Sequence, residues 1–188
     1  VRSILGGLRL ELGDMLDLRP RDEYCFLFVT DFPQFEYSEE EKRYVAMHHP
    51  FTAPMDECIP YLESDQGSVK AKAYDLVLNG IELSSGSIRI TDPDLQKRMF
   101  HLLGLTDEEA QTKFGYLTDA FRYGAPPHGG MGIGLDRLVM QMLGCESLRD
   151  VIAYPKVQNT SELMTECPSE VDVGQLSELG ISLLHNHS

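Results

Sequence analysis

The spacing of apolar and polar residues predicts both helices and strands in this chain. Residues 3–16 repeat apolar side chains at helical spacing, with charged residues off that stripe, so an amphipathic helix is expected to end near Leu18. Residues 25–29 (CFLFV) are apolar and rich in aromatic side chains, which predicts a short buried strand. Residues 48–70 contain three prolines and a polar stretch, and are expected to form a long loop.

A β-hairpin is the clearest local signal. Two strand-like runs, 72–78 and 81–90, flank the dipeptide Asn79-Gly80, which suits the positive φ angles of a type I′ turn. Residues that lie opposite each other in an antiparallel pair share a face. The hairpin is therefore expected to present one set of side chains to each side of a sheet.

Two carboxylates occur on this predicted hairpin. Counting back from the turn pairs Asp75 with Ser84 and places Asp75 and Glu82 diagonally on the same face. Neighbouring carboxylates repel each other unless a cation lies between them, and Mg²⁺ carried by a nucleoside triphosphate is a usual partner. The alternative is that both side chains point into water on a solvated face.

Arg89 and a pair of histidines are further candidates for ligand contacts. Arg89 follows Glu82 by seven positions, so strict alternation places it on the opposite face unless a bulge within 84–86 returns it. A guanidinium on a pocket floor offers a planar fork for a carboxylate, whereas the alternative is an exposed side chain on an edge strand. His48 and His49 begin the long loop, and neighbours on an extended segment point to opposite sides, so one of them is expected to reach a given ligand.

Residues 129–137 (GGMGIGLDR) combine a glycine-rich strand with the start of a helix. Glycines at alternate positions remove side chains from one face and let a flat ligand lie against the backbone. Arg137 in the first helical turn can meet an anion near the helix N-terminus. The segment has neither the P-loop nor the Rossmann glycine pattern. The alternative is a glycine-rich packing strand.

The remaining elements complete a mixed fold. Residues 92–93 (Asp-Pro) open one helix, and a capping box over 106–109 opens another that runs to about Tyr123. A short strand is predicted over 131–135, followed by a helix over 136–143. Strands and helices do not alternate in a regular βαβ rhythm, so the expected fold class is α+β, a mostly antiparallel sheet with flanking helices.

Composition narrows the classes of function. Sixteen basic and 30 acidic residues give a formal net charge of −14, which argues against general affinity for nucleic acid or anionic membranes but leaves room for a small basic pocket. Four irregularly spaced cysteines form no C-x-x-C pair, which indicates reduced thiols in a cytoplasmic protein. No apolar run is long enough to span a membrane. The absence of an initiator Met suggests a piece of a longer protein.

The chain resembles class II aminoacyl-tRNA synthetases. Residues 132–137 (GIGLDR) match the third signature motif of that class, a glycine-rich strand that leads into a helix with an Arg. The resemblance to the bacterial-type aspartyl-tRNA synthetases is more specific, and it extends from about residue 5 to residue 175. It rests on five blocks in the right order: 31–37 (DFPQFEY), 48–54 (HHPFTAP), 73–90 (AYDLVLNGIELSSGSIRI), 113–140 (KFGYLTDAFRYGAPPHGGMGIGLDRLVM) and 149–156 (RDVIAYPK).

The resemblance implies roles for single residues. His48 and His49 lie where the family contacts aspartate, and Arg89 corresponds to the arginine that holds the side-chain carboxylate of aspartate. Asp75 and Glu82 match the acidic residues that hold Mg²⁺ and ATP. Glu82 and Arg137 are the implied catalytic residues. The implied ATP-binding set is Glu82, Gly132, Gly134, Leu135, Asp136 and Arg137.

As a whole, the resemblance implies an aspartate–tRNA ligase. Such an enzyme uses ATP and Mg²⁺ to convert L-aspartate to aspartyl-adenylate and transfers it to tRNA(Asp), as a homodimer. Residues 1–20 are implied to be a helix leading out of an insertion domain, 21–168 the C-terminal part of the catalytic domain, and 169–188 a tail. The sequence holds no candidate for the second signature motif, so the chain alone is expected to be inactive. The alternative is an inactive synthetase-like paralogue that acts as a nucleotide-binding or interaction module.

Overall fold

The computed structural model describes residues 2–18 and 23–183 of the chain. The chain divides into two compact units, Val1–Leu135 and Asp136–Ser188. The first unit contains, in order, α1 (Arg2–Met15), β1 (Phe26–Val29), β2 (Phe35–Ser38), β3 (Arg43–Ala46), two short 3-10 helices (Asp56–Tyr61 and Gln66–Ser68), β4 (Ala73–Leu78), β5 (Ile81–Ile88), α2 (Pro93–Leu102), α3 (Asp107–Phe121) and β6 (Gly129–Ile133).

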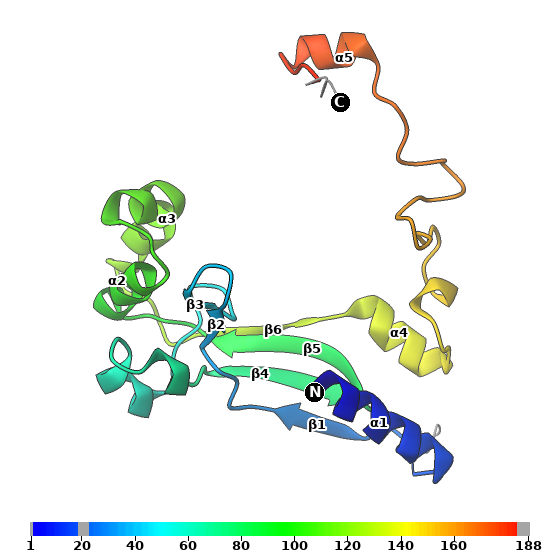
Figure 1. Ribbon diagram of the computed structural model, residues 1–188, viewed down its shortest axis with the longest axis horizontal. Helices are drawn as coiled ribbons and strands as arrows, with labels where there is room; N and C mark the ends of the chain where they lie inside the picture. The colour runs from blue at the N-terminus through cyan, green and yellow to red at the C-terminus, as the bar shows by residue number, and fades with distance from the viewer. Residues whose placement is uncertain (1, 19–22, 184–188) are drawn as a thin grey trace. The chain divides into compact units, whose positions relative to one another are not determined.

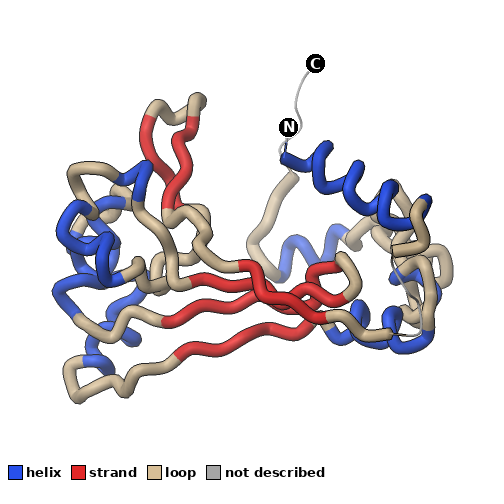
Figure 2. Tube along the Cα trace, turned by 90° about the horizontal axis from the view of Figure 1, so that it is seen from below, coloured by secondary structure: helices blue, strands red, loops and turns tan. Residues whose placement is uncertain are grey.

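A four-stranded antiparallel sheet forms the centre of the first unit. Its strand order is β1-β4-β5-β6, and every neighbouring pair is antiparallel. Figure 1 shows these strands side by side, with α2 and α3 at one end of the sheet. The strands β2 and β3 pair separately, and Figure 2 shows their hairpin projecting from the plane of the larger sheet. The expected α+β class with a mostly antiparallel sheet is confirmed, whereas the β2–β3 hairpin was not predicted.

The turn between β4 and β5 forms as its sequence predicts. Asn79 and Gly80 have φ angles of 48° and 84°, the two positive values that a type I′ turn requires. The Asn79 side chain also accepts a hydrogen bond from the backbone N–H of Cys25 at 2.8 Å and donates one to the carbonyl of Glu23 at 2.9 Å. The turn residue therefore ties the hairpin to the segment that enters β1.

The register of the hairpin differs from the expected one because a bulge lies closer to the turn. The pairing of Val77 with Glu82 is as predicted, but the register shifts between Leu76 and Val77. Asp75 consequently pairs with Ser85, so its predicted pairing with Ser84 is wrong. The extra residue of β5 is Leu83, which comes directly before residues 84–86, where the sequence predicted the bulge.

The strand β1 is present but is not buried, so the expectation of a buried strand is wrong. Its four side chains are 39–59% exposed. The strand lies at the end of the strand order, where it pairs with β4 alone among the described strands. Aromatic and β-branched residues favour a strand wherever it lies, whereas burial depends on what covers its faces.

Much of the hydrophobic core comes from the segment expected to be a long loop. Cys58, Leu62 and Val69 are at most 1% exposed, and they pack with residues of β2 and α2. Gln34, the residue before β2, is joined to this segment, because its backbone N–H donates to the carbonyl of Val69 at 2.8 Å. Residues 48–70 therefore hold the core together beside the sheet. The core cluster consists of Phe35, Ala53, Cys58, Leu62, Val69, Ile90 and Met99.

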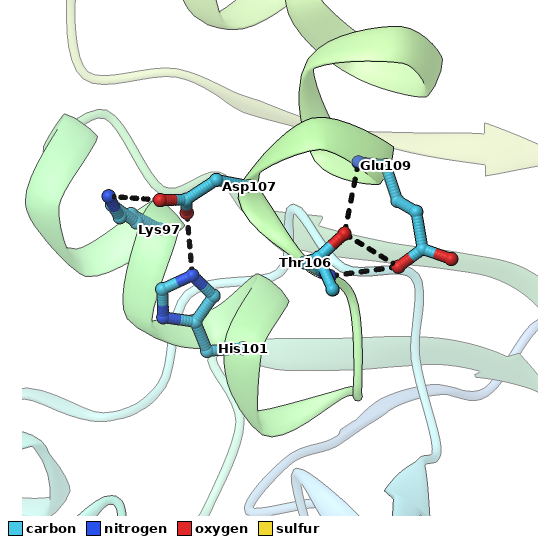
Figure 3. Close-up of polar contacts among 5 residues, drawn as sticks. All are labelled: Lys97, His101, Thr106, Asp107 and Glu109. Atoms are coloured by element: carbon cyan, nitrogen blue, oxygen red, sulfur yellow. Dashed lines mark hydrogen bonds and ion pairs between the residues drawn. The ribbon is translucent and has the colours of Figure 1, made fainter.

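Local capping residues define the helical hairpin α2–α3. Asp92 accepts hydrogen bonds from the backbone N–H groups of the first turn of α2, at 2.8 and 2.9 Å. Thr106 and Glu109 form the predicted capping box at the start of α3. Figure 3 shows both this box and the ion pairs that join the helices, in which Lys97 and His101 of α2 lie 2.8 and 2.7 Å from the carboxylate of Asp107.

These ion pairs predict an acid-sensitive contribution to stability. Hydrogen bonds from Lys97 and His101 lower the pKa of Asp107. A carboxylate with a lowered folded-state pKa stabilises the fold above its unfolded pKa, and that stability is lost as the pH falls through the lowered value. We expect Asp107→Asn to lower the melting temperature at pH 7 and to have no effect near pH 2. The control is Glu108→Gln in the same helical turn, and an equal loss in both variants at pH 7 would contradict the prediction.

The second unit follows the glycine-rich strand. The strand β6 begins and ends two residues earlier than predicted, and α4 (Leu135–Leu143) follows it as expected. A 3-10 helix (Leu148–Asp150) and α5 (Val173–Glu178) lie farther along, with Asp172 as the N-cap of α5. Over the described ranges, no helix has the length and apolar character needed to cross a membrane.

Candidate active site

Because of the bulge in β5, five polar side chains share one face of the sheet. Asp75 pairs with Ser85, so these two residues share a face, and alternation adds Ser87 and Arg89 to it. Glu82 pairs with Val77, which lies two residues from Asp75 and therefore on the same face. The sequence required a bulge to bring Arg89 to the side of the carboxylates, and the structure has one.

A cavity of about 520 Å³ opens over this face. It lies between β4, β5, β6 and the first residues of the loop that follows β3. Of the residues predicted to contact ligands, His48, His49, Asp75, Arg89 and Gly132 line it, whereas Glu82 is not among its walls. The full lining is His48, His49, Thr52, Ala73, Asp75, Ser85, Gly86, Ser87, Arg89, His128, Gly129, Gly130, Met131 and Gly132.

Arg89 supplies positive charge to this cavity. Its backbone N–H donates to the carbonyl of His128 at 3.0 Å, which fixes the main chain beside β6. Its Nη1 lies 2.9 Å from Nδ1 of His49, and within the described ranges the guanidinium contacts no carboxylate. A partly buried cation without a counter-ion favours an anionic ligand. The arrangement thus suits a molecule that carries a carboxylate.

His48 contributes a polar atom with no protein partner. Its Nε2 is buried and makes no hydrogen bond to any described residue. The ring packs edge-on against Phe32, with 5.8 Å between the ring centroids. Buried polar atoms normally find a hydrogen-bond partner. A ligand in the cavity could supply the partner that the described protein residues do not.

The charge of Glu82 affects the protonation of Asp75. Burial raises the pKa of Asp75, the charge of Glu82 raises it further, and the charge of His48 opposes both effects. Among the described residues, no cluster of three or more His, Cys, Asp or Glu side chains could hold a metal by itself. Two carboxylates do not complete a metal site by themselves, and the assignment of Asp75 and Glu82 to Mg²⁺ stays a prediction.

Two glycines of β6 keep the cavity open. Gly132 pairs with Ser85 and Gly130 with Ser87, so both face the cavity. A Cβ atom built on either glycine meets nothing within 4 Å. The third glycine of β6, Gly129, is constrained by packing, since a Cβ on it would lie 2.8 Å from the side chain of Ile88. The bare backbone of β6 on the cavity side matches the flat surface that the sequence predicted.

The end of the glycine-rich segment spans the boundary between the two units. Gly134 is anchored to the hairpin, because its backbone N–H donates to the carbonyl of Leu83 at 2.9 Å. Leu135 is the last residue of the first unit, and Asp136 and Arg137 belong to the second. The assignments of these residues to ATP binding stay predictions.

Hydroxyl groups behind His49 were not predicted from the sequence. Thr52 and Ser87 are 0% and 3% exposed, and their Oγ atoms lie 3.4 Å from Nε2 of His49. Nδ1 of His49 thus faces Arg89 and Nε2 faces Ser87, while the Thr52 hydroxyl lies within 3.5 Å of both nitrogens. Ser87 could have been placed on this face by alternation from Asp75 and Ser85 once the bulge was known.

The sequence matches a known family over most of its length. The family described as tRNA synthetases class II (D, K and N) matches residues 14–158. The chain belongs to this family. This result agrees with the resemblance carried by the glycine-rich motif, and with a fold in which helices flank an antiparallel sheet.

Individual class II relatives are similar over almost the whole chain. The aspartate–tRNA ligase of Clostridium beijerinckii is 58% identical over 181 residues, which are 96% of this chain and 30% of the relative. The aspartate–tRNA(Asp/Asn) ligase of Lachnoclostridium phytofermentans is 57% identical over 183 residues, 97% of this chain and 31% of the relative. The chain thus spans about 30% of the length of these relatives.

A solved structure of the same family is similar in fold. The asparaginyl-tRNA synthetase of Entamoeba histolytica in complex with asparaginyl-adenylate superimposes with a TM-score of 0.54 at 27% identity. The match covers 73% of this chain and 26% of that protein. The expected class II synthetase fold is therefore confirmed.

Proposed function

We propose that this chain is part of an aspartate–tRNA ligase and forms the aspartate-binding side of its active site. The enzyme would join L-aspartate to ATP, giving aspartyl-adenylate and pyrophosphate, and then transfer the aspartyl group to tRNA(Asp). The observation that carries the proposal is the cavity that gathers Arg89, His48 and Asp75 over one sheet face in a chain so similar to aspartate–tRNA ligases.

Arg89 would select the amino acid by its charge. Its guanidinium offers two parallel N–H donors that fit the side-chain carboxylate of aspartate. An asparagine side chain would leave the cation unpaired in a partly desolvated cavity, which is costly. His48 would donate or accept a further hydrogen bond through its buried Nε2, which is otherwise without a described partner.

The carboxylates and the glycine-lined strand would serve ATP. Asp75 and Glu82 would hold Mg²⁺, which when bound neutralises charge on the phosphate oxygens. Gly132 and Gly134 would let the nucleotide lie against the backbone, while Leu135, Asp136 and Arg137 would continue the ATP site, with Arg137 on the terminal phosphate. Because the protein forms no covalent bond in such a reaction, positioning and charge neutralisation would account for the rate.

The remaining features of the whole enzyme extend this proposal. We infer that residues 21–168 form the C-terminal part of a class II catalytic domain, with 1–20 as a helix from an insertion domain and 169–188 as a tail. The complete ligase would work as a homodimer in the cytoplasm. What supports these statements is the similarity to relatives about three times as long as this chain.

A chimera tests the proposed function directly. We define the chimeric ligase as the Clostridium beijerinckii enzyme in which this chain replaces the matched 181-residue stretch. We expect it to catalyse aspartate-dependent ATP–pyrophosphate exchange at a rate within about tenfold of the parent, because such similar segments preserve core packing. The melting temperature of the chimera is compared with that of the parent. A folded chimera without exchange activity would refute the proposal.

A further inference from the structure

The position of His49 beside Arg89 points to a role that neither the sequence nor the comparisons assign. The sequence placed His49 with His48 as a contact for aspartate. In the structure, however, both ring nitrogens of His49 already face protein groups. Nδ1 lies 2.9 Å from Nη1 of Arg89, and Nε2 lies 3.4 Å from the hydroxyl of Ser87, while the Thr52 hydroxyl lies 3.4 Å from Nε2 and 3.5 Å from Nδ1.

These contacts determine which nitrogen of His49 carries the proton. A guanidinium can only donate hydrogen bonds, so Nδ1 must accept. The backbone N–H of Phe51 points at the same atom from 3.3 Å, and it too can only donate. Two donors therefore converge on Nδ1, which leaves the proton on Nε2, where the hydroxyl oxygen of Ser87 can accept it.

The surroundings hold this tautomer in place. Thr52 and Ser87 are buried, and the Thr52 hydroxyl donates to that of Ser87 at 3.3 Å. The ring of His49 also packs against Phe51, with 5.9 Å between the centroids. Burial, the charge of Arg89 and the charge of His48 lower the pKa of His49, which agrees with a neutral ring. A neutral imidazole can accept from Arg89, whereas an imidazolium would repel it.

We infer that His49 is a positioning residue, a neutral imidazole protonated on Nε2 that holds one edge of the Arg89 guanidinium. The other edge contacts no carboxylate of the described residues and can receive the carboxylate of the ligand. The inference rests on the proposed function for the identity of that ligand, but the hydrogen bond itself belongs to the protein without ligand. Pre-ordering Arg89 lowers the cost of immobilising a long, flexible side chain when the ligand binds.

Two amides separate the roles of the two ring nitrogens. The Oδ1 of an asparagine can occupy the place of Nδ1, so His49→Asn keeps an acceptor for Arg89. The amide of a glutamine reaches the place of Nε2, so His49→Gln keeps the contact to Ser87 and loses the acceptor for Arg89. Both variants remove the ring, so their difference reports the hydrogen bond to Arg89 and not the lost packing.

The first measurement uses the 188-residue chain without ligand. Nitrogen NMR of arginine side chains distinguishes a guanidinium whose rotation is restricted by hydrogen bonds from one that rotates freely. We expect separate Nη1 and Nη2 signals for Arg89 in the wild type and in His49→Asn, and a single averaged signal in His49→Gln. Arg98, which binds Glu63 outside the cavity at 2.7 and 2.9 Å, is the internal reference. Separate Arg89 signals in His49→Gln would overturn the inference.

The second measurement uses steady-state exchange by the chimeric ligase. Loss of one hydrogen bond to a charged group corresponds to about a tenfold change or more. We expect His49→Gln to raise the KM for aspartate about tenfold with the KM for ATP unchanged, and His49→Asn to recover at least half of that loss on a logarithmic scale. Equal KM values for aspartate in the two variants would also overturn the inference. A wild-type chimera without exchange would instead count against the proposed function, and the NMR result would still decide the role of His49.

Discussion

Replacing Arg89 by leucine in the chimeric ligase should reduce kcat/KM for aspartate by about 10³-fold or more, since several charge-assisted hydrogen bonds are lost together. Arg89→Lys should reduce it by about 10²-fold, because an ammonium keeps the charge but lacks the planar fork that pairs with a carboxylate. The loss should fall on aspartate and not on ATP. Initial-rate ATP–pyrophosphate exchange, with each substrate varied in turn, measures both.

The control for this prediction is a second arginine, which binds a carboxylate of the protein outside the cavity. Arg98 on α2 binds Glu63 through two nitrogens and donates to the carbonyl of Ile59 at 3.1 Å. Arg98→Lys should change kcat/KM for aspartate by less than about threefold, because exposed ion pairs contribute little. If Arg89→Lys behaves like Arg98→Lys, Arg89 does not bind the substrate carboxylate and the proposed orientation of aspartate is wrong.

Local chemistry explains which parts of the fold the sequence predicts. Asn79 and Gly80 form the expected turn because their preference for positive φ acts over two residues. The caps at Asp92 and Thr106 likewise depend on hydrogen bonds within one helical turn. Each of these signals is contained in a few neighbouring residues, so no tertiary contact is needed to interpret it.

Features that depend on distant segments could not be predicted in the same way. Several positions between Glu82 and Gly86 could hold a bulge, and the observed register also has to satisfy pairing with β6, since Ser85 lies opposite Gly132. Exposure of the β1 side chains depends on which distant segments pack against the faces of the strand. The sequence was therefore sufficient to require a bulge if Arg89 is to join Asp75, but it could not locate that bulge.

The candidate site also has residues that the sequence predicts and residues that only the fold brings together. Its charged members were found from residue type and from the family resemblance. Thr52 and Ser87 were missed because their hydroxyls meet His49 only through the fold, and 35 positions separate these two hydroxyl residues in the chain. Small hydroxyl side chains are common in loops and strands for structural reasons, so no pattern in the sequence distinguishes these two.

Substitution of two glycines beside the cavity should have different effects on the stability of the fold. A Cβ atom on Gly132 meets nothing within 4 Å, so Gly132→Val should leave the melting temperature of the chain nearly unchanged. A Cβ on Gly86 would overlap the carbonyl oxygen of Gly130 and lie 2.7 Å from Cε2 of Tyr74. Backbone cannot move aside as a flexible side chain can, so Gly86→Ala should lower the free energy of unfolding by about 1–3 kcal/mol or more.

Although Gly132→Val should leave the fold stable, it should impair ligand binding. The valine side chain at position 132 would project into the cavity, so Gly132→Val in the chimeric ligase should raise the KM for ATP at least about tenfold, the equivalent of 1.4 kcal/mol. Thermal melts of the chain and exchange kinetics of the chimera give the two readouts. A stable Gly132→Val variant with unchanged KM for ATP and for aspartate would mean that neither substrate lies against β6. Without that contact, the glycine-lined strand would lose its proposed part in nucleotide binding, and the cavity would retain only its aspartate-binding side.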